Sequence, residues 1–164
     1  MSTHVRLQFS TVFAAAVMAL GAAAYASDDA PTSHVVQAKG VKFDPMIVYI
    51  EPGDKVSFER MPSHNVETID EMVPEGQEKI FTELGDNIEL AFDVEGIVVY
   101  KCTPHWGNRM GGIIVVGEPE DPGAIIDAYM ASTEVVQENL PARGLLKRLR
   151  TDMEEKGLIE SPAS

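Results

Sequence analysis

The sequence has little cysteine, little positive charge and no long hydrophobic run. Its 164 residues include one cysteine, and 13 basic residues stand against 26 acidic ones, which gives a formal net charge of -13. A single thiol excludes a framework of intramolecular disulfides. The acidic balance argues against nucleic acid as a partner, because its phosphates would be repelled. The length excludes a large multidomain enzyme and a (β/α)₈ barrel.

The longest apolar run lies near the N-terminus, over residues 11–26. It is short for a transmembrane helix, which needs about 20 apolar residues. It ends in Ala24-Tyr25-Ala26, the small-x-small pattern that signal peptidase accepts. We therefore predict a secretory signal peptide over 1–26, cleaved after Ala26, and a monomeric periplasmic protein with no membrane span in the mature chain. The alternative is an uncleaved N-terminal anchor.

The middle of the chain has the pattern of a β-protein. Short runs rich in β-branched and aromatic residues are separated by turn residues such as Pro52-Gly53-Asp54 and Gly85-Asp86. Seven or eight short strands at this spacing indicate a β-sandwich. The runs are 35–39, 46–50, 55–59, 65–69, 79–82, 87–92, 97–101 and 112–116.

Beyond residue 118 the period changes to that of helices. Asp121-Pro122 is a typical N-cap followed by a first helical residue. Apolar residues then recur at helical spacing on either side of Pro141, and Gly157 is placed to end the second helix. We predict two tail helices that pack back on the sandwich. The predicted division is a signal peptide over 1–26, a β-domain over 27–118 and a helical extension over 119–164.

Few residues that could carry chemistry remain once the signal peptide is set aside. Cys102, His105 and Met110 fall in one short segment, and His64 lies far upstream. A lone thiol in an oxidising compartment is a liability unless it is buried, catalytic or bound to metal. One thiolate, two imidazoles and one thioether favour copper, because sulfur ligands suit Cu(I) while imidazoles keep Cu(II) acceptable. A His₂Cys plane with a long axial Met is the blue-copper arrangement, so we predict one type 1 copper ion.

Other readings of these residues stay open at this point. Each residue alone could be ordinary: a buried small cysteine, a gap-filling methionine or a surface histidine. Zinc also binds Cys and His, although it makes little use of a thioether. A Cys-His nucleophilic pair is disfavoured, because a tight proline turn lies between Cys102 and His105.

The sequence resembles the pseudoazurins, which belong to the cupredoxins. The fragments that carry the resemblance include Pro52-Gly53-Asp54, His64-Asn65-Val66-Glu67, Val73-Pro74-Glu75-Gly76 and Tyr100-Lys101-Cys102-Thr103-Pro104-His105. The helical tail also matches. The resemblance implies a Greek-key β-sandwich with two C-terminal helices, and copper held by His64, Cys102, His105 and Met110. It further implies that Asn65 joins the two ligand segments by hydrogen bonds, with Thr103 bracing the loop.

The implied function is one-electron transfer between periplasmic proteins, with copper nitrite reductase or c-type cytochromes as transient partners. Electrons would leave through the exposed edge of His105. Trp106 takes the place of a smaller aromatic residue. The net charge departs from that of the family, whose members dock through lysines, because residues 27–118 contain seven basic and 17 acidic residues. Lys39, Lys42 and Arg109 could form a local basic ring; without one, the partner would be basic and nitrite reductase would be doubtful.

Two classes of function remain, an electron carrier and a copper protein for storage, delivery or sensing. Copper-handling proteins usually show open clusters of Met or Cys, whereas only Met110 among the dispersed methionines has ligand spacing. A closed site with four side-chain ligands favours the carrier. It leaves no open coordination position for a substrate, so we predict that the protein is not an enzyme.

Overall fold

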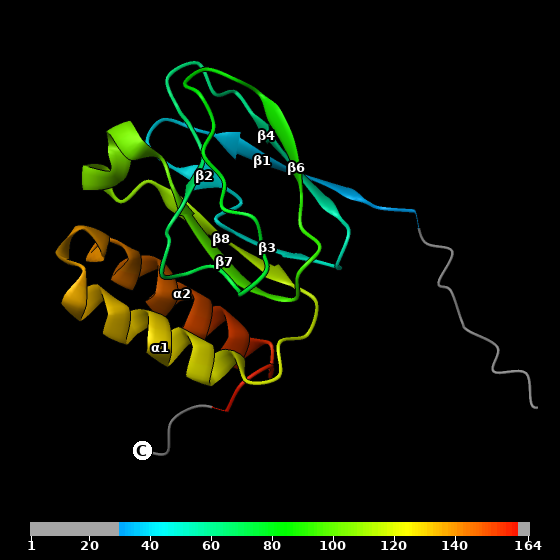
Figure 1. Cartoon of the computed structure of the whole chain (residues 1–164), viewed down its shortest axis with the longest axis vertical. Coiled ribbons are helices and arrows are strands. Elements are labelled where there is room, and N and C mark those ends of the chain that lie inside the picture. The colour runs from blue at the N-terminus through cyan, green and yellow to red at the C-terminus, as the bar shows by residue number, and fades with distance from the viewer. Residues whose placement is uncertain (1–29, 161–164) are drawn as a thin grey trace, which may run out of the picture.

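A computed structural model describes residues 30–160 (Figure 1). The predicted signal peptide lies outside the described residues. Within them, eight strands are followed by two α-helices, and two short 3-10 helices, η1 and η2, lie in connections. The bounds are β1 Ser33–Ala38, β2 Phe43–Asp44, β3 Ile47–Ile50, β4 Lys55–Glu59, β5 Glu67–Thr68, β6 Ile88–Ala91, β7 Gly96–Lys101, η1 Thr103–Asn108, β8 Gly111–Val116, α1 Pro122–Val135, η2 Gln137–Asn139 and α2 Ala142–Glu155.

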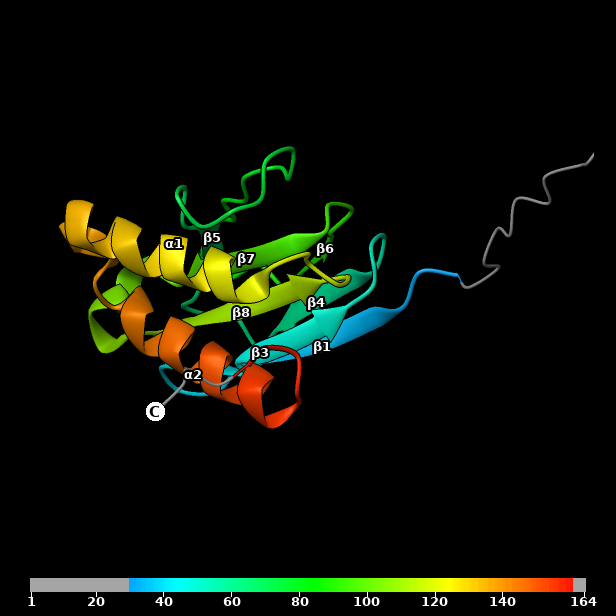
Figure 2. The same ribbon diagram turned by 90° about the horizontal axis from the view of Figure 1, so that it is seen from below.

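The strands form two mixed sheets that pack face to face. The first has the order β2-β1-β4-β6 and the second the order β3-β8-β7-β5. The pairs β1–β4 and β3–β8 are parallel, whereas β7–β8 and β4–β6 are antiparallel. The predicted β-sandwich is therefore confirmed. Figure 2 shows the two helices lying side by side across the outer face of the second sheet, which confirms the predicted helical extension.

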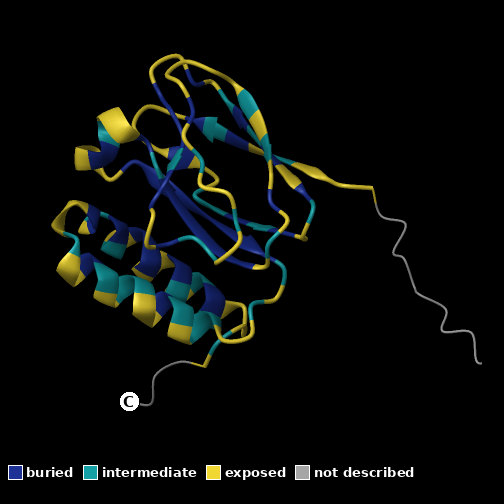
Figure 3. Ribbon diagram, viewed as in Figure 1, coloured by how far each residue is buried: buried dark blue, intermediate teal, exposed yellow. Residues whose placement is uncertain are grey.

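The second sheet is the middle of three layers, and its sequence shows why. Along β7, Val98 and Tyr100 belong to the core between the two sheets, whereas Ile97 and Val99 belong to the core under the helices. All four side chains are at most 1% exposed. Strands buried on both faces read as continuous apolar runs, as β7 and β8 do (Figure 3).

The start of α1 and the end of α2 lie where the sequence predicts, whereas α1 ends at Val135, before the predicted break at Pro141. The Asp121 side chain accepts a hydrogen bond from the backbone amide of Ala124 at 2.9 Å and so caps α1. At the end of α2, Gly157 has a positive φ of 70°. Its amide and that of Leu158 donate to the carbonyls of Glu154 and Met153, the Schellman arrangement that satisfies terminal carbonyls. Within 30–160 no helix has the length and apolar character needed to cross a membrane.

The predicted strand over 79–82 is wrong, and threonine side chains explain the difference. The hydroxyl of Thr68 accepts the amide hydrogen of Ile80 at 3.0 Å, and that of Thr82 accepts the amide hydrogen of Val66 at 2.8 Å. These bonds replace part of the ladder, and one isolated bridge between Glu67 and Phe81 remains. The predicted run over 65–69 is reduced to the two residues of β5, which pair with β7. The sequence reading also missed the two-residue strand β2.

Candidate metal centre

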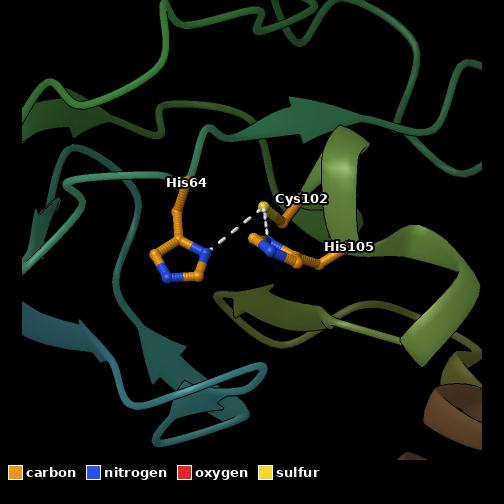
Figure 4. A group of neighbouring side chains, drawn as sticks. All are labelled: His64, Cys102 and His105. Atoms are coloured by element: carbon orange, nitrogen blue, oxygen red, sulfur yellow. Dashed lines mark hydrogen bonds between the residues drawn. The ribbon is translucent and has the colours of Figure 1, made fainter.

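Two connections bring three of the candidate ligands together. His64 lies in the connection between β4 and β5, Cys102 directly follows β7, and His105 lies in η1. In Figure 4 both imidazoles point toward the cysteine sulfur. The Sγ atom of Cys102 is 3.6 Å from Nδ1 of His64 and 3.4 Å from Nδ1 of His105. One donor atom from each of the three residues lies within 4.8 Å of the other two.

Backbone hydrogen bonds fix the loop that carries Cys102 and His105. The amide of His105 donates to the carbonyl of Cys102 at 3.0 Å, and the amide of Cys102 donates to the carbonyl of Met110 at 2.9 Å. Arg109 ends η1 with a left-handed φ of 61°. This conformation is unfavourable for a residue with a side chain. It reverses the chain so that Met110 returns beside Cys102 before β8 begins.

Met110, the fourth predicted ligand, lies beside the cluster. Its side chain is fully buried and belongs to the same core between the sheets as Cys102. The cysteine is fully buried as well, and His64 is 7% exposed. His105 is the one partly exposed member of the four. The site is therefore closed on the protein side and reaches solvent at His105.

The surroundings of Cys102 act on its thiol in opposite directions. Burial raises the pKa of the thiol, because desolvation disfavours the charged form. The backbone amides of Asn65 and His105 lower that pKa by hydrogen bonding to the sulfur. At His64, burial and then the neighbouring His105 ring lower the pKa of the imidazole. Burial is the larger of the two effects at Cys102, so the pKa of its thiol is raised overall. Cysteine ligates a metal as the thiolate, so metal binding here would release the thiol proton.

Asn65 joins the two segments that carry the candidate ligands. Its side-chain amide donates to the hydroxyl of Thr103 at 3.0 Å, and its carbonyl oxygen accepts the Thr103 backbone amide at 2.8 Å. The bridging role expected from the resemblance is confirmed. Sequence reasoning missed the next members of this network: the Thr103 hydroxyl donates to Glu67, which also pairs with Lys101 at 3.5 Å. The register of β5 against β7 places Glu67 opposite Lys101, but two residues of strand give no sequence signal for it.

The donor set fits copper. A nitrogen and a sulfur on one first-row ion, with bonds of about 2.0 and 2.3 Å and an angle of roughly 105–120° between them, lie about 3.4–3.7 Å apart. The two sulfur–nitrogen separations, 3.4 and 3.6 Å, have this size. One thiolate and two imidazoles also suit zinc. A buried methionine beside them favours copper, because a thioether is a soft ligand that suits Cu(I).

Comparison with known proteins agrees with this donor set. A family model described as copper binding proteins, plastocyanin/azurin family, matches residues 30–117. The chain belongs to this family. Among its relatives, a pseudoazurin of Methylorubrum extorquens is 35% identical over 121 residues, which cover 69% of this chain and 80% of the relative. A pseudoazurin of Paracoccus pantotrophus is 36% identical over 120 residues, covering 71% and 83% respectively.

The fold agrees as well. The crystal structure of the pseudoazurin from Methylobacterium extorquens AM1 superposes with a TM-score of 0.52 at 35% identity, covering 55% of this chain and 79% of that one. The resemblance to pseudoazurins read from the sequence motifs is thereby confirmed, and with it the cupredoxin fold. Family, fold and relatives together make this protein a blue copper electron carrier, and its cofactor is a type 1 copper ion.

Proposed function

We propose that His64, Cys102, His105 and Met110 hold the copper ion, and that the protein carries one electron at a time between other redox proteins without catalysing a reaction itself. The observation that supports this most directly is the convergence of the Cys102 sulfur with two imidazole nitrogens at 3.4 and 3.6 Å. When bound, copper supplies the one-electron redox chemistry. The chain supplies a fixed set of donor atoms, so the ligands need not move when the copper changes between its oxidised and reduced forms.

His105 is the proposed exit for the electron. Cys102 and Met110 are fully buried, and the only ligand ring that reaches the surface in part is that of His105. Its neighbours Pro104 and Gly107 are exposed and uncharged. A partner protein can therefore approach this edge closely without removing water from a charged group, which is expensive.

The segment from Cys102 to Met110 is called the copper loop below. A groove beside it favours a partner with an acidic surface. It is lined by Asn108 and Arg109 of that loop, by residues 41–44 and Lys39, and by residues of α2 that include Arg148. Within the described part of the chain, Lys42, Arg109 and Arg148 form no ion pair, whereas Lys39 binds Asp44. Basic charge therefore gathers near the proposed exit of an otherwise acidic protein.

This local charge favours partners with an acidic docking surface. Within the family expectation, a copper nitrite reductase or a c-type cytochrome fits if it presents such a surface. Opposite charges accelerate encounter and make its rate dependent on ionic strength. We expect the rate at which this protein associates with such a partner, measured by stopped flow, to fall as the salt concentration rises. At low salt, the Arg148→Gln variant should associate more slowly than the wild-type protein. A matched Lys147→Gln variant, which removes a neighbouring α2 charge outside the groove lining, should change it less. A rate that ignores salt contradicts the proposed steering.

Residues 1–26 are proposed as a cleaved signal peptide that exports the protein to the periplasm, followed by a β-domain over 27–118 and a helical extension over 119–164. The experiment is expression of the full chain in a Gram-negative host. Mass spectrometry of the periplasmic fraction should give a mature protein that begins at Ser27. A retained N-terminus in the membrane fraction contradicts the proposal and supports the uncleaved anchor.

The visible spectrum of the mature protein tests the copper site. After addition of Cu(II), we expect an intense absorption band in the red that a reductant bleaches and an oxidant restores. Cys102→Ser should abolish the band, because it needs a copper–thiolate bond, and Met110→Leu should keep a thiolate band with altered position or intensity. Absence of the band in the wild-type protein, with weak or exchangeable copper, contradicts the carrier and favours storage or delivery.

A further inference from the structure

The copper loop is attached to the C-terminal helices through its tryptophan. Trp106 lies in η1 directly after His105, and the residue is 9% exposed and belongs to the core under the helices. The indole Nε1 donates a hydrogen bond to the backbone carbonyl of Glu138 at 2.8 Å. Glu138 belongs to η2, in the bend between α1 and α2. In Figure 1 this bend lies next to η1.

The bend that receives this bond is itself fixed to the body of the protein. Asn139 is 1% exposed and its side-chain amide donates to the carboxylate of Glu71 at 2.8 Å. Leu145 of α2 packs nearby, since a Cβ built on Gly111 would meet both its side chain and the Trp106 ring within 3.1 Å. Glu138 itself is exposed, but the bend that carries it is held to the body of the protein through its buried neighbour Asn139.

The imidazole of His105 has few restraints of its own. Metal-ligating histidines usually donate their second ring nitrogen to a carboxylate or carbonyl, which fixes the ring. Among residues 30–160, the one hydrogen-bond contact of the His105 ring is that of Nδ1 with Cys102. Its direction thus depends on how η1 is rotated. A 3-10 helix has three residues per turn, so fixing the ring of Trp106 on one side fixes the direction of His105 about a third of a turn away.

We propose that the hydrogen bond from Trp106 to Glu138 makes the α1–α2 bend a positioning element for the His105 imidazole. Trp106 is then a positioning residue, and the helical extension takes part in setting the geometry of the metal centre. This inference rests on the proposed role of His105 as a ligand.

The test uses the fact that the chain contains one tryptophan. Expression in a tryptophan auxotroph fed with 3-benzothienylalanine replaces the indole N–H by sulfur at position 106 alone and leaves ring size almost unchanged. The matched control is Tyr129→Phe. It also removes one bond from the extension to a backbone carbonyl, that of Ile97 at 2.9 Å, at the other end of β7 from Cys102.

The first measurement is amide hydrogen exchange in the metal-free protein. The amides of His105, Arg109 and Met110 are hydrogen-bonded within the loop and report its opening. We expect their protection to fall about tenfold in the analogue, the effect of losing one hydrogen bond, and to stay unchanged in the Tyr129→Phe control. Equal protection in the analogue and the wild-type protein overturns the proposal.

The second measurement is made with copper bound. We expect the analogue to change the intensity ratio of the two copper–thiolate absorption bands and to slow electron self-exchange several-fold, whereas Tyr129→Phe leaves both unchanged. Reduced amide protection together with an unaltered absorption spectrum and an unaltered self-exchange rate would show that the hydrogen bond is merely structural, and would also overturn the proposal. If the wild-type protein itself lacks a copper–thiolate band, the proposed function fails, but exchange in the metal-free protein still decides whether Trp106 holds the loop.

Discussion

Removal of the Asn65 side chain should destabilise the protein by an amount that can be worked out from its contacts. Asn65 is 2% exposed and makes two hydrogen bonds to Thr103, of 3.0 and 2.8 Å. A hydrogen bond contributes about 1 kcal/mol net to stability, so Asn65→Ala should lower the free energy of unfolding by about 2 kcal/mol. The backbone amide of residue 65 remains, so its effect on the Cys102 thiol is retained.

The assay is urea denaturation of the metal-free protein, because a bound metal would itself hold the two segments together. With a denaturant slope of about 2 kcal/mol/M, the midpoint should fall by about 1 M. A double-mutant cycle with Thr103→Val isolates the contact between the two side chains. We expect a coupling of about 1 kcal/mol, since Thr103→Val keeps the backbone bond to Asn65. A loss below about 0.5 kcal/mol in Asn65→Ala, or additive single effects, would refute the view that this contact joins the loops.

Three further outcomes are expected. Gly112→Ala should destabilise the protein by about 2–3 kcal/mol, because a Cβ would lie 2.3 Å from the buried Tyr100 hydroxyl; urea denaturation measures this, and Gly107→Ala, with no neighbour within 4 Å of its Cβ, is the control. A hydrogen bond from His34 and bonds from backbone amides lower the pKa of Asp54, so this carboxylate stabilises the folded protein above its unfolded pKa of about 3.9 and the stabilisation is lost as pH falls below that value. The free energy of unfolding should therefore fall less steeply with decreasing pH in Asp54→Asn than in the wild-type protein, and equal slopes would contradict this. Copper that binds the native state alone should raise the free energy of unfolding by about 2.7 kcal/mol at a free concentration 100 times Kd, and chelation should reverse the gain.

The elements with the clearest sequence periods were predictable. The apolar stripe of α2, including Leu145, Leu149 and Met153, is buried as expected, and Gly157 ends the helix. The strands β7 and β8 were predictable because an unbroken β-branched run has few alternatives. The convergence of His64 with Cys102 and His105 could be predicted from chemistry, because a lone thiol in a protein predicted to be exported is a liability unless it binds a metal or is buried, and two histidines complete a metal-binding set. The assignment of Met110 and of the domain boundaries stays a prediction.

The features that escaped sequence reasoning depend on contacts between distant segments. Nothing local in residues 79–82 shows that the hydroxyls of Thr68 and Thr82 take up amide donors that a strand would use. The bond from Trp106 to Glu138 spans 32 residues and ends on a backbone carbonyl, which every residue possesses, so the identity of residue 138 carries no signal. The sequence indicated Lys42 and Arg109 as members of a possible basic ring, but nothing in it showed that Arg148 of α2 lines the same groove.

The position of the second sheet between two cores also bears on the order in which the protein can mature. All eight strands have been synthesised once the chain reaches Val116, yet the outer face of the sheet then carries Ile97, Val99, Ile113 and Val115 without a cover. The two helices that cover this face follow the strands in the chain and so emerge after them. Until the two helices dock, the newly made sandwich exposes this apolar face, and exposed apolar surface favours aggregation. Docking of α1 and α2 therefore completes the burial of the domain that precedes them.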